Sequence, residues 1–166
     1  HGEVLAGAVF SDPLETDALF LVDIQPALEA VAPESTLIQA ILQRAAGSGA
    51  KTLAEALTIG ESDELEIFLE NRLESPSLSR ETTLVLGHLH YIRGRIGQAA
   101  RVYSQQARKT PDDTEINFQL GLCFFKLGDP STAKNFFKRV IRHRPGHFNA
   151  IVLLDRIDAD GIRSAG

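Results

Sequence analysis

The chain has 166 residues, of which 43% are apolar and 23% charged, and its formal net charge at pH 7 is −5. This composition is typical of a folded globular domain, and no apolar run approaches the ~20 residues that a membrane-spanning helix needs. Cys123 is the single cysteine, which excludes an internal disulfide, and no signal or transit peptide is visible.

The sequence contains no methionine, even at position 1, so we expect a trimmed or excised piece of a longer chain. A signal peptide or anchor could have been removed with the rest. The compartment is therefore left open between the cytoplasm and a bacterial periplasm.

Charge is divided unevenly along the chain. Residues 1–79 contain 14 acidic and 3 basic residues, whereas residues 80–166 contain 8 acidic and 14 basic ones. We expect two solvated faces, or an acidic half packed on a basic half, rather than a basic half that meets an acidic partner.

The acidic half, residues 1–79, predicts a series of short helices. Residues 1–12, with "EVLAGAVF", fit either an extended segment or a helix. Helices are predicted for "PALEAVA", "ESTLIQAILQRAA", "AKTLAEALTI" and "DELEIFLENRL" (63–73). Ser62 or Asp63 is expected to cap the last of these, with Glu66 completing a capping box after Asp63. "SPSLS" (75–79) predicts a break.

The stretch "AAGSGAKT" (45–52) uses the residue types of a phosphate-binding loop. Aligned on Lys51 and Thr52, however, the two required glycines are replaced by Ala45 and Ala50. The preceding residues have a helical apolar pattern, not that of a buried strand. We expect a helix–helix corner, with Gly47 just past the end of a helix.

A 34-residue repeat is found when the sequence from residue 81 onward is compared with itself. The matched pairs are Glu81 with Glu115, Leu86-Gly87 with Leu120-Gly121, Tyr91 with Phe125, Gly94 with Gly128, Ala99 with Ala133, Tyr103 with Phe137, Arg108 with Arg142 and Pro111 with Pro145. Gly87 and Gly121 lie mid-helix, where glycine costs about 1 kcal/mol relative to alanine, so we expect a second helix to cross closely there. The proline of each unit is expected to close its helix pair.

"LGHLHYIRGRIGQAARVYSQQARKTP" and "LGLCFFKLGDPSTAKNFFKRVIRHRP" together resemble the tetratricopeptide repeat family. The first repeat departs from the family pattern at His90, where a tyrosine or other large residue is usual, and at Gln106, where a small one is usual. The resemblance implies an all-α fold of antiparallel helix pairs stacked in a right-handed solenoid.

Two domains are expected: an acidic helical region over residues 1–79 and a repeat domain over residues 80–166. The N-terminal helices are interpreted as helix pairs that continue the stack, with a helical extension as the alternative. Leu154 keeps the leucine of a third leucine-glycine pair without its glycine. "HFNAIVLLDRIDA" therefore predicts a terminal capping helix that buries Phe148, Ile151, Val152, Leu154 and Ile157 and exposes Asp155, Arg156 and Asp158.

The resemblance implies a concave groove that binds a hydrophobic or amphipathic segment of a protein partner. Its lining is expected to be Leu84, His88, Tyr91, Phe118, Leu122, Phe125, Lys126 and Arg156. The alternative is that the N-terminal helices cover several of these residues. One subfamily holds chaperone tails with a lysine and asparagine clamp. Leu84, His88, Phe118 and Leu122 stand at those positions, so no such binding is expected.

No residue pattern in the sequence predicts catalysis, a cofactor or a metal. His88 and His90 are two residues apart and point to different helix faces, and His143 and His147 are separated by Pro145 and Gly146. The acidic residues Glu61, Asp63, Glu64 and Glu66 are interpreted as a solvated helix start. Cys123 is expected to pack in the core.

Three functions follow from these observations. The first is a non-catalytic adaptor, scaffold or assembly factor. The second is an accessory or regulatory domain of a larger enzyme or secretion machine. The weakest is nucleic-acid binding through "KNFFKRVIRHR" (134–144), whose basic residues are instead expected to form a solvated face around buried Phe137, Val140 and Ile141.

Overall fold

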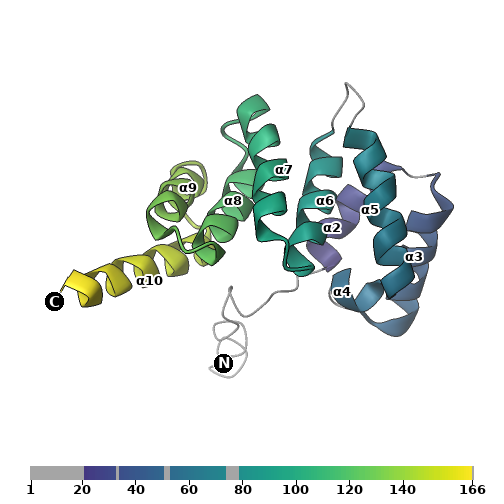
Figure 1. Ribbon diagram of the computed structural model, residues 1–166, viewed down its shortest axis with the longest axis horizontal. Helices are drawn as coiled ribbons and strands as arrows, with labels where there is room; N and C mark the ends of the chain where they lie inside the picture. Colours follow the sequence, from purple (N-terminus) through teal and green to yellow (C-terminus); the bar gives the residue numbers. More distant parts are fainter. Residues whose placement is uncertain (1–20, 33, 51–52, 74–78, 166) are drawn as a thin grey trace. The chain divides into compact units, whose positions relative to one another are not determined.

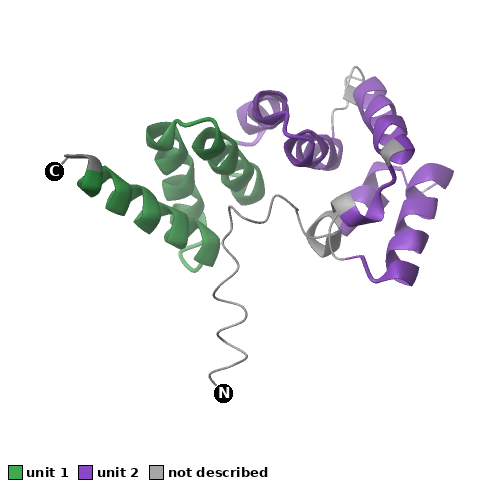
Figure 2. Cartoon of the chain, turned by 60° about the horizontal axis from the view of Figure 1, so that its bottom comes forward, with its two compact units in different colours: residues 1–17, 111–166 green, residues 18–110 purple. Residues whose placement is uncertain are grey.

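The computed structural model describes residues 21–32, 34–50, 53–73 and 79–165, and every regular element within these ranges is a helix. The described residues form two compact units: unit 1 contains those from 111 to 165, and unit 2 contains those from 21 to 110 (Figure 2). Across the described ranges, none of the helices combines the length and apolarity that crossing a membrane would require. The all-α prediction is confirmed, while the predicted domain boundary at residues 79 and 80 stays a prediction.

The helices are labelled in chain order in Figure 1. Unit 2 contains α2 (Leu21–Val31), α3 (Thr36–Ser48), α4 (Leu53–Ala56), α5 (Ile59–Leu73), α6 (Arg80–Ile92) and α7 (Ile96–Lys109). Unit 1 contains α8 (Thr114–Lys126), α9 (Pro130–His143) and α10 (Phe148–Ala165). The repeated sequence thus forms two hairpins, α6–α7 and α8–α9.

Local sequence sets the ends of the hairpin helices. Ser79 and Asp113 cap α6 and α8, each accepting a hydrogen bond from the backbone N–H three residues on. Gly94 and Gly128 follow the first helix of each hairpin with φ of 77° and 81°, a conformation that strongly favours glycine. These two glycines, which are matched in the repeat, thus end the first helix of each hairpin.

The hairpins close on their mid-helix glycines. A Cβ added to Gly87 would lie 2.3 Å from Cζ of Tyr103, and one added to Gly121 would lie 2.4 Å from Cε1 of Phe137. Both aromatic side chains are fully buried. The expectation of a close helix crossing at these glycines is confirmed, and an aromatic ring occupies the space that a Cβ would need.

Helix α6 is the centre of unit 2. It packs against α7 and also against α2 and α5, while α3 contacts α2, α4 and α5. All residues from Thr82 to Tyr91 are buried, so α6 has no open face along these turns. An apolar helix of this kind, buried all round, belongs to the core of a unit rather than to its surface.

Two boundaries in the N-terminal region differ from the predictions. Helix α3 continues through Gly47 to Ser48, and Gly49 provides the left-handed C-cap with φ 69°. Helix α5 begins at Ile59, earlier than predicted, because Thr58 and Glu61 form the capping box. The Glu61 N–H donates to Oγ1 of Thr58, and the Thr58 N–H donates to Oε2 of Glu61. Ser62, Asp63 and Glu66 therefore lie inside the helix.

Helix α10 packs against α9, as expected of a capping helix. Its buried stripe is Ala150, Leu153 and Ile157, whereas Phe148 is 53% exposed. The prediction that Phe148 is buried is wrong, because spacing by three and four residues from Ala150 selects a different face. His147 caps the start of α10, because its Nδ1 accepts a hydrogen bond from the Ala150 N–H.

Candidate protein-binding site in unit 1

The first-repeat residues predicted to line a groove are covered in this structure. Leu84, His88 and Tyr91 are each at most 6% exposed, on a helix packed by α2, α5 and α7. Burial lowers the pKa of His88 to about 3, which keeps its imidazole neutral, and its ring meets Tyr103 edge-on at 6.0 Å between centroids. The contribution of these three residues to partner binding stays a prediction.

The second-repeat residues divide into core and surface. Phe118 is 7% exposed, with ring centroids 5.8 Å from Phe137 and 4.6 Å from His147. Leu122 is buried too. Phe125 remains half-buried and Lys126 is exposed, so the end of α8 is the part of this predicted surface that reaches solvent.

An open hollow of about 960 Å³ lies beside Phe125 in unit 1. Its walls come from the α8–α9 corner and from the C-terminal half of α10. The lining residues are Phe125, Gly128, Pro130, Ser131, Lys134, Ile157, Asp158, Asp160, Gly161 and Ile162. This volume falls within the range of sites that bury small ligands or side chains of a partner.

The sequence builds the corner wall from a turn and a cap. Gly128 turns the chain at φ 81°, and Asp129 then caps α9 through the Thr132 N–H. Pro130 occupies the first turn of α9, where its missing N–H costs no helical hydrogen bond. Hydrogen bonds from the Thr132 side chain and backbone lower the pKa of Asp129, so the cap remains a carboxylate well below neutral pH.

The hollow combines an apolar lining with charged residues. Phe125, Pro130 and Ile157 contribute apolar surface, and Ile162 is 76% exposed. Lys134 and Asp158 form an ion pair across it, from α9 to α10. An exposed apolar side chain beside half-buried aromatic surface and paired charges is the arrangement expected of a surface that contacts an amphipathic protein segment.

Arg156, which is predicted to line the groove, does not line the hollow. It lies on α10 and is half-buried. Phe125 is the one predicted lining residue that lines the hollow. Ile157 and Ile162 were not among the predicted ones, because all of these except Arg156 lie on α6 and α8. The sequence signal that could have found Ile162 is a large aliphatic residue within an otherwise polar helix end, "DADGIRSAG".

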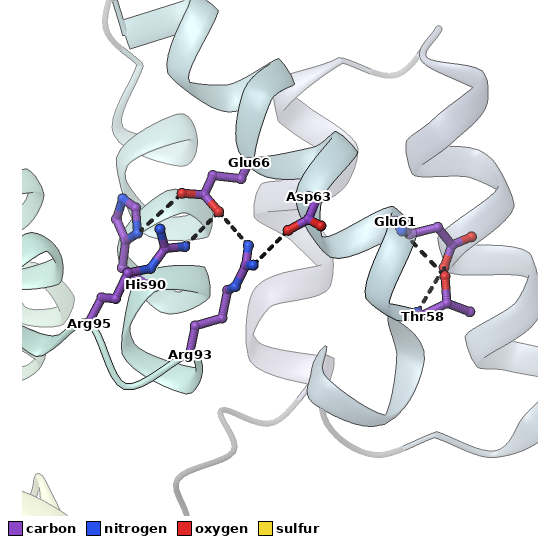
Figure 3. A network of polar contacts seen from close by, with 7 residues as sticks. All are labelled: Thr58, Glu61, Asp63, Glu66, His90, Arg93 and Arg95. Carbon is purple, nitrogen blue, oxygen red and sulfur yellow. Dashed lines mark hydrogen bonds and ion pairs between the residues drawn. The ribbon is translucent and has the colours of Figure 1, made fainter.

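Glu61, Asp63 and Glu66 form ion pairs, which corrects the interpretation of a solvated helix start for these three residues, whereas Glu64 is exposed. Glu66 accepts hydrogen bonds from Arg95, at 2.6 Å, and from Arg93, which also donates to Asp63 at 2.6 Å (Figure 3). The hydrogen bond from Arg95 is the main cause of the lowered pKa of Glu66. Acidic residues that precede position 80 thus pack on basic residues that follow it, as one interpretation of the charge division expected.

Glu61 makes a separate link between α5 and α3. Its carboxylate accepts two hydrogen bonds from the guanidinium of Arg44, one of them at 2.7 Å to Oε2. The hydrogen bond from Arg44 is the main reason that the pKa of Glu61 is lowered to about 2. Such a two-pronged pair fixes the orientation of both side chains.

The other sequence motifs do not form a reactive site among the described residues. Lys51 and Thr52 of "AAGSGAKT" lie outside them. Cys123 is buried, and burial raises the pKa of its thiol to about 12, so it stays protonated and unreactive. Phe137 and Val140 are buried, Ile141 is half-buried, and most of the basic residues around them face solvent, as expected.

The two late histidines serve separate local contacts. His143 ends α9 and its Nε2 lies 3.2 Å from Oδ1 of Asp112. His147 caps α10 and contacts Phe118. The expectation that they do not share one continuous helix is confirmed.

Comparison with solved structures supports the fold. The chain is similar to PcrH from Pseudomonas aeruginosa, with a TM-score of 0.50 and 21% identity over 76% of this chain and 89% of that one. It is equally similar to PcrH in complex with the chaperone binding region of PopB, at the same TM-score and identity, over 76% of this chain and 94% of that one. No protein-family model matches the chain, and neither does any curated protein. The likeness establishes a helical fold of the tetratricopeptide type.

Proposed function

We propose that this chain is a non-catalytic protein-interaction module that holds an apolar or amphipathic segment of a partner protein in the hollow of unit 1. The observation that carries the proposal is the open hollow itself, with Phe125, Ile157 and Ile162 in its lining. Ile162 is 76% exposed and lines the hollow, so its side chain is accessible to a partner.

The energetics favour a segment with one apolar face. Full burial of a leucine or phenylalanine side chain contributes roughly 1.5–3 kcal/mol, so two or three such side chains can give useful affinity after the ordering cost. The charged residues around the hollow contribute mainly to orientation, because exposed ion pairs add little to affinity.

The comparison adds a precedent for this role. PcrH, which has the same type of fold, is solved with the chaperone binding region of PopB. A fold of this type therefore can hold a segment of another protein. We propose the same kind of role here, without assigning the same partner or the same binding positions.

A binding experiment with two matched variants tests the proposal. Peptides that bind the full chain would be selected from a displayed peptide library, and their affinities measured by fluorescence anisotropy. Ile162→Lys places a charge at the hollow, whereas Ile67→Lys changes an isoleucine that is 59% exposed on α5 in unit 2. Both positions are exposed, so both variants are expected to keep the fold.

We expect Ile162→Lys to weaken binding of an amphipathic peptide at least tenfold and Ile67→Lys to leave it unchanged. A tenfold change in affinity corresponds to about 1.4 kcal/mol. Loss of one buried aliphatic contact, together with the burial of a charged lysine against apolar surface, is expected to exceed this value. Failure to select any peptide, or an equal loss in the two variants, would contradict the proposed site.

A further inference from the structure

Three side chains of the types that ligate metals lie together where α5 packs against α6. Glu66 and Glu70 are four residues apart and share a face of α5, and His90 approaches from α6. One donor atom from each lies within 4.8 Å of the other two. The sequence could not show this group, because Glu66 and Glu70 lie on α5 and His90 lies on α6, and spacing along the chain does not reveal contacts between two helices.

His90 is a buried imidazole that lacks a hydrogen-bond partner at Nδ1. The residue is 3% exposed, and Nδ1 lies 3.9 Å from Oε1 of Glu66, which is too far for a hydrogen bond. A buried polar atom that is left unsatisfied costs about 1–3 kcal/mol. A ligand bound between His90 and the carboxylates would satisfy it.

The two arginines orient Glu66 toward His90. Arg93 and Arg95 both donate to Oε2 of Glu66, which leaves Oε1 facing the imidazole (Figure 3). Hydrogen bonds of this kind to a ligating carboxylate are typical of the groups that surround metal sites and fix their ligands. The arginines therefore need not compete for the oxygen that a metal would use.

The local charges allow a cation to bind. Three carboxylates lie here, those of Asp63, Glu66 and Glu70. Two arginines pair with them: Arg93 with Asp63 and Glu66, and Arg95 with Glu66. Burial is the main effect on His90 and lowers its pKa, and a neutral imidazole is the form that binds metals.

We propose that Glu66, Glu70 and His90 form a Zn²⁺ site that joins α5 to α6. Imidazole with carboxylates is a donor set that suits Zn²⁺ rather than Mg²⁺ or Ca²⁺. At Zn–ligand distances of about 2.1 Å, tetrahedral donors lie about 3.4 Å apart, so donors that are up to 4.8 Å apart must close by up to about 1.4 Å. Glu70 is exposed and can make this movement, and water can take the fourth position from its open side.

The site has a structural consequence that is independent of peptide binding in unit 1. An ion held by both helices would fix the N-terminal helices to the first repeat. Since the ion binds only the folded arrangement, it would raise the thermal stability of unit 2.

Titration of the metal-free full chain with ZnCl₂, by calorimetry in a buffer that does not chelate the ion, tests this proposal. Co²⁺ serves as a second probe, since its visible absorption reports tetrahedral coordination. Two variants remove a ligand. Glu70→Gln changes an exposed side chain outside the arginine pairs, and His90→Phe introduces the residue type that Phe124 provides at the same place in the second repeat.

Two control variants keep the proposed ligands. Glu64→Gln changes an exposed carboxylate of α5 outside the group, and His143→Asn removes the other imidazole near a carboxylate, that of Asp112. Circular dichroism confirms the fold of each variant.

We expect one Zn²⁺ per chain, affinity at least tenfold weaker in Glu70→Gln and in His90→Phe, and no change in either control. Tetrahedral Co²⁺ bands should disappear in the same two variants. Absence of saturable binding, or binding that survives both ligand variants, would overturn the proposal. Binding lost only in His143→Asn would also overturn it, because the ion would then sit at Asp112.

Discussion

The α6–α7 and α8–α9 hairpins are built on one 34-residue pattern, yet they have different surroundings. Tyr91 of the first is 4% exposed and lies on a helix that α2 and α5 also pack against. Phe125, its counterpart, is half-buried and lines an open hollow beside α10. The repeat thus specifies how each hairpin closes, and the helices outside the pattern decide which hairpin keeps an exposed surface at this position.

A second position separates the hairpins in the same way. His90 and Phe124 occupy equivalent places in the first and second repeats. His90 faces Glu66 of α5, whereas Phe124 stacks on Phe136 at 5.6 Å between centroids. Beside His90, Arg93 and Arg95 pair with Glu66 and so hold the first hairpin to α5.

The largest effect is expected from emptying the core of either hairpin. Tyr103→Ala and Phe137→Ala each remove a fully buried ring, which costs about 3–5 kcal/mol of unfolding free energy. Urea unfolding followed by circular dichroism measures the loss. Phe148→Ala, at a site 53% exposed, is the control and should change little. If one ring proves dispensable, the two hairpins do not close in the same way.

Smaller losses should follow from adding one methyl group at the hairpin crossings. Gly87→Ala and Gly121→Ala place a Cβ within 2.3–2.4 Å of a buried ring, so overpacking should cost about 1–3 kcal/mol despite the better helix propensity of alanine. Gly97→Ala in α7, with no heavy atom within 4 Å of the new Cβ, is the control and should be neutral or stabilising. Equal stability of all three variants in urea would show that the crossings are looser than described.

Glu66→Gln should distinguish the first hairpin from the second. The change leaves Arg93 and Arg95 without their shared carboxylate, which is 12% exposed, and should cost about 1–3 kcal/mol in buffer containing a chelator. Glu64→Gln on the same helix is the control. Hydrogen exchange, measured residue by residue at increasing urea concentration, should show the loss of stability in α5 and α6 and not in α8 and α9.

The smallest expected effect depends on pH and concerns the link between α3 and α5. The pKa of Glu61 is lowered from 4.5 to about 2, mainly by the hydrogen bond from Arg44. Its stabilising contribution is therefore complete above about pH 4.5 and is lost as the pH falls toward 2. Arg44→Gln should melt below the parent chain at pH 7, and the two melting temperatures should converge near pH 2. A constant difference across this range would show that the ion pair is not the cause.

The sequence predicted the hairpins because their signals are local. Gly94 and Gly128 end helices. Gly87 and Gly121 leave space beside the helix, and an aromatic ring from later in the same repeat fills it. These relations recur at a fixed spacing, so one chain compared with itself reveals them. The resemblance to tetratricopeptide repeats added the pairing of helices, and the structure confirms the all-α fold of this type.

Other features could not be read from spacing, because they depend on contacts between distant segments. The pairing of Glu66 with Arg95 joins two helices, and the hollow depends on how α10 lies against α9. The buried face of α10 also differs from the predicted one, because Leu153 is buried and Phe148 is exposed. Packing against α9, and not the size of the side chains, decides which face of α10 is buried. Thr58 caps α5 in place of Ser62 or Asp63. Several residues near this helix start are of types that can cap, so the sequence alone did not decide among them.

Hydrogen exchange of the chain with and without a selected peptide tests the central claim most directly. The account predicts slower exchange in the last turn of α8 around Phe125 and in α10 from Ile157 to Ile162, with no change in α6 from Thr82 to Tyr91. Protection confined to α6 and its neighbours, with α10 unaffected, would place the binding surface in the first hairpin and contradict the account.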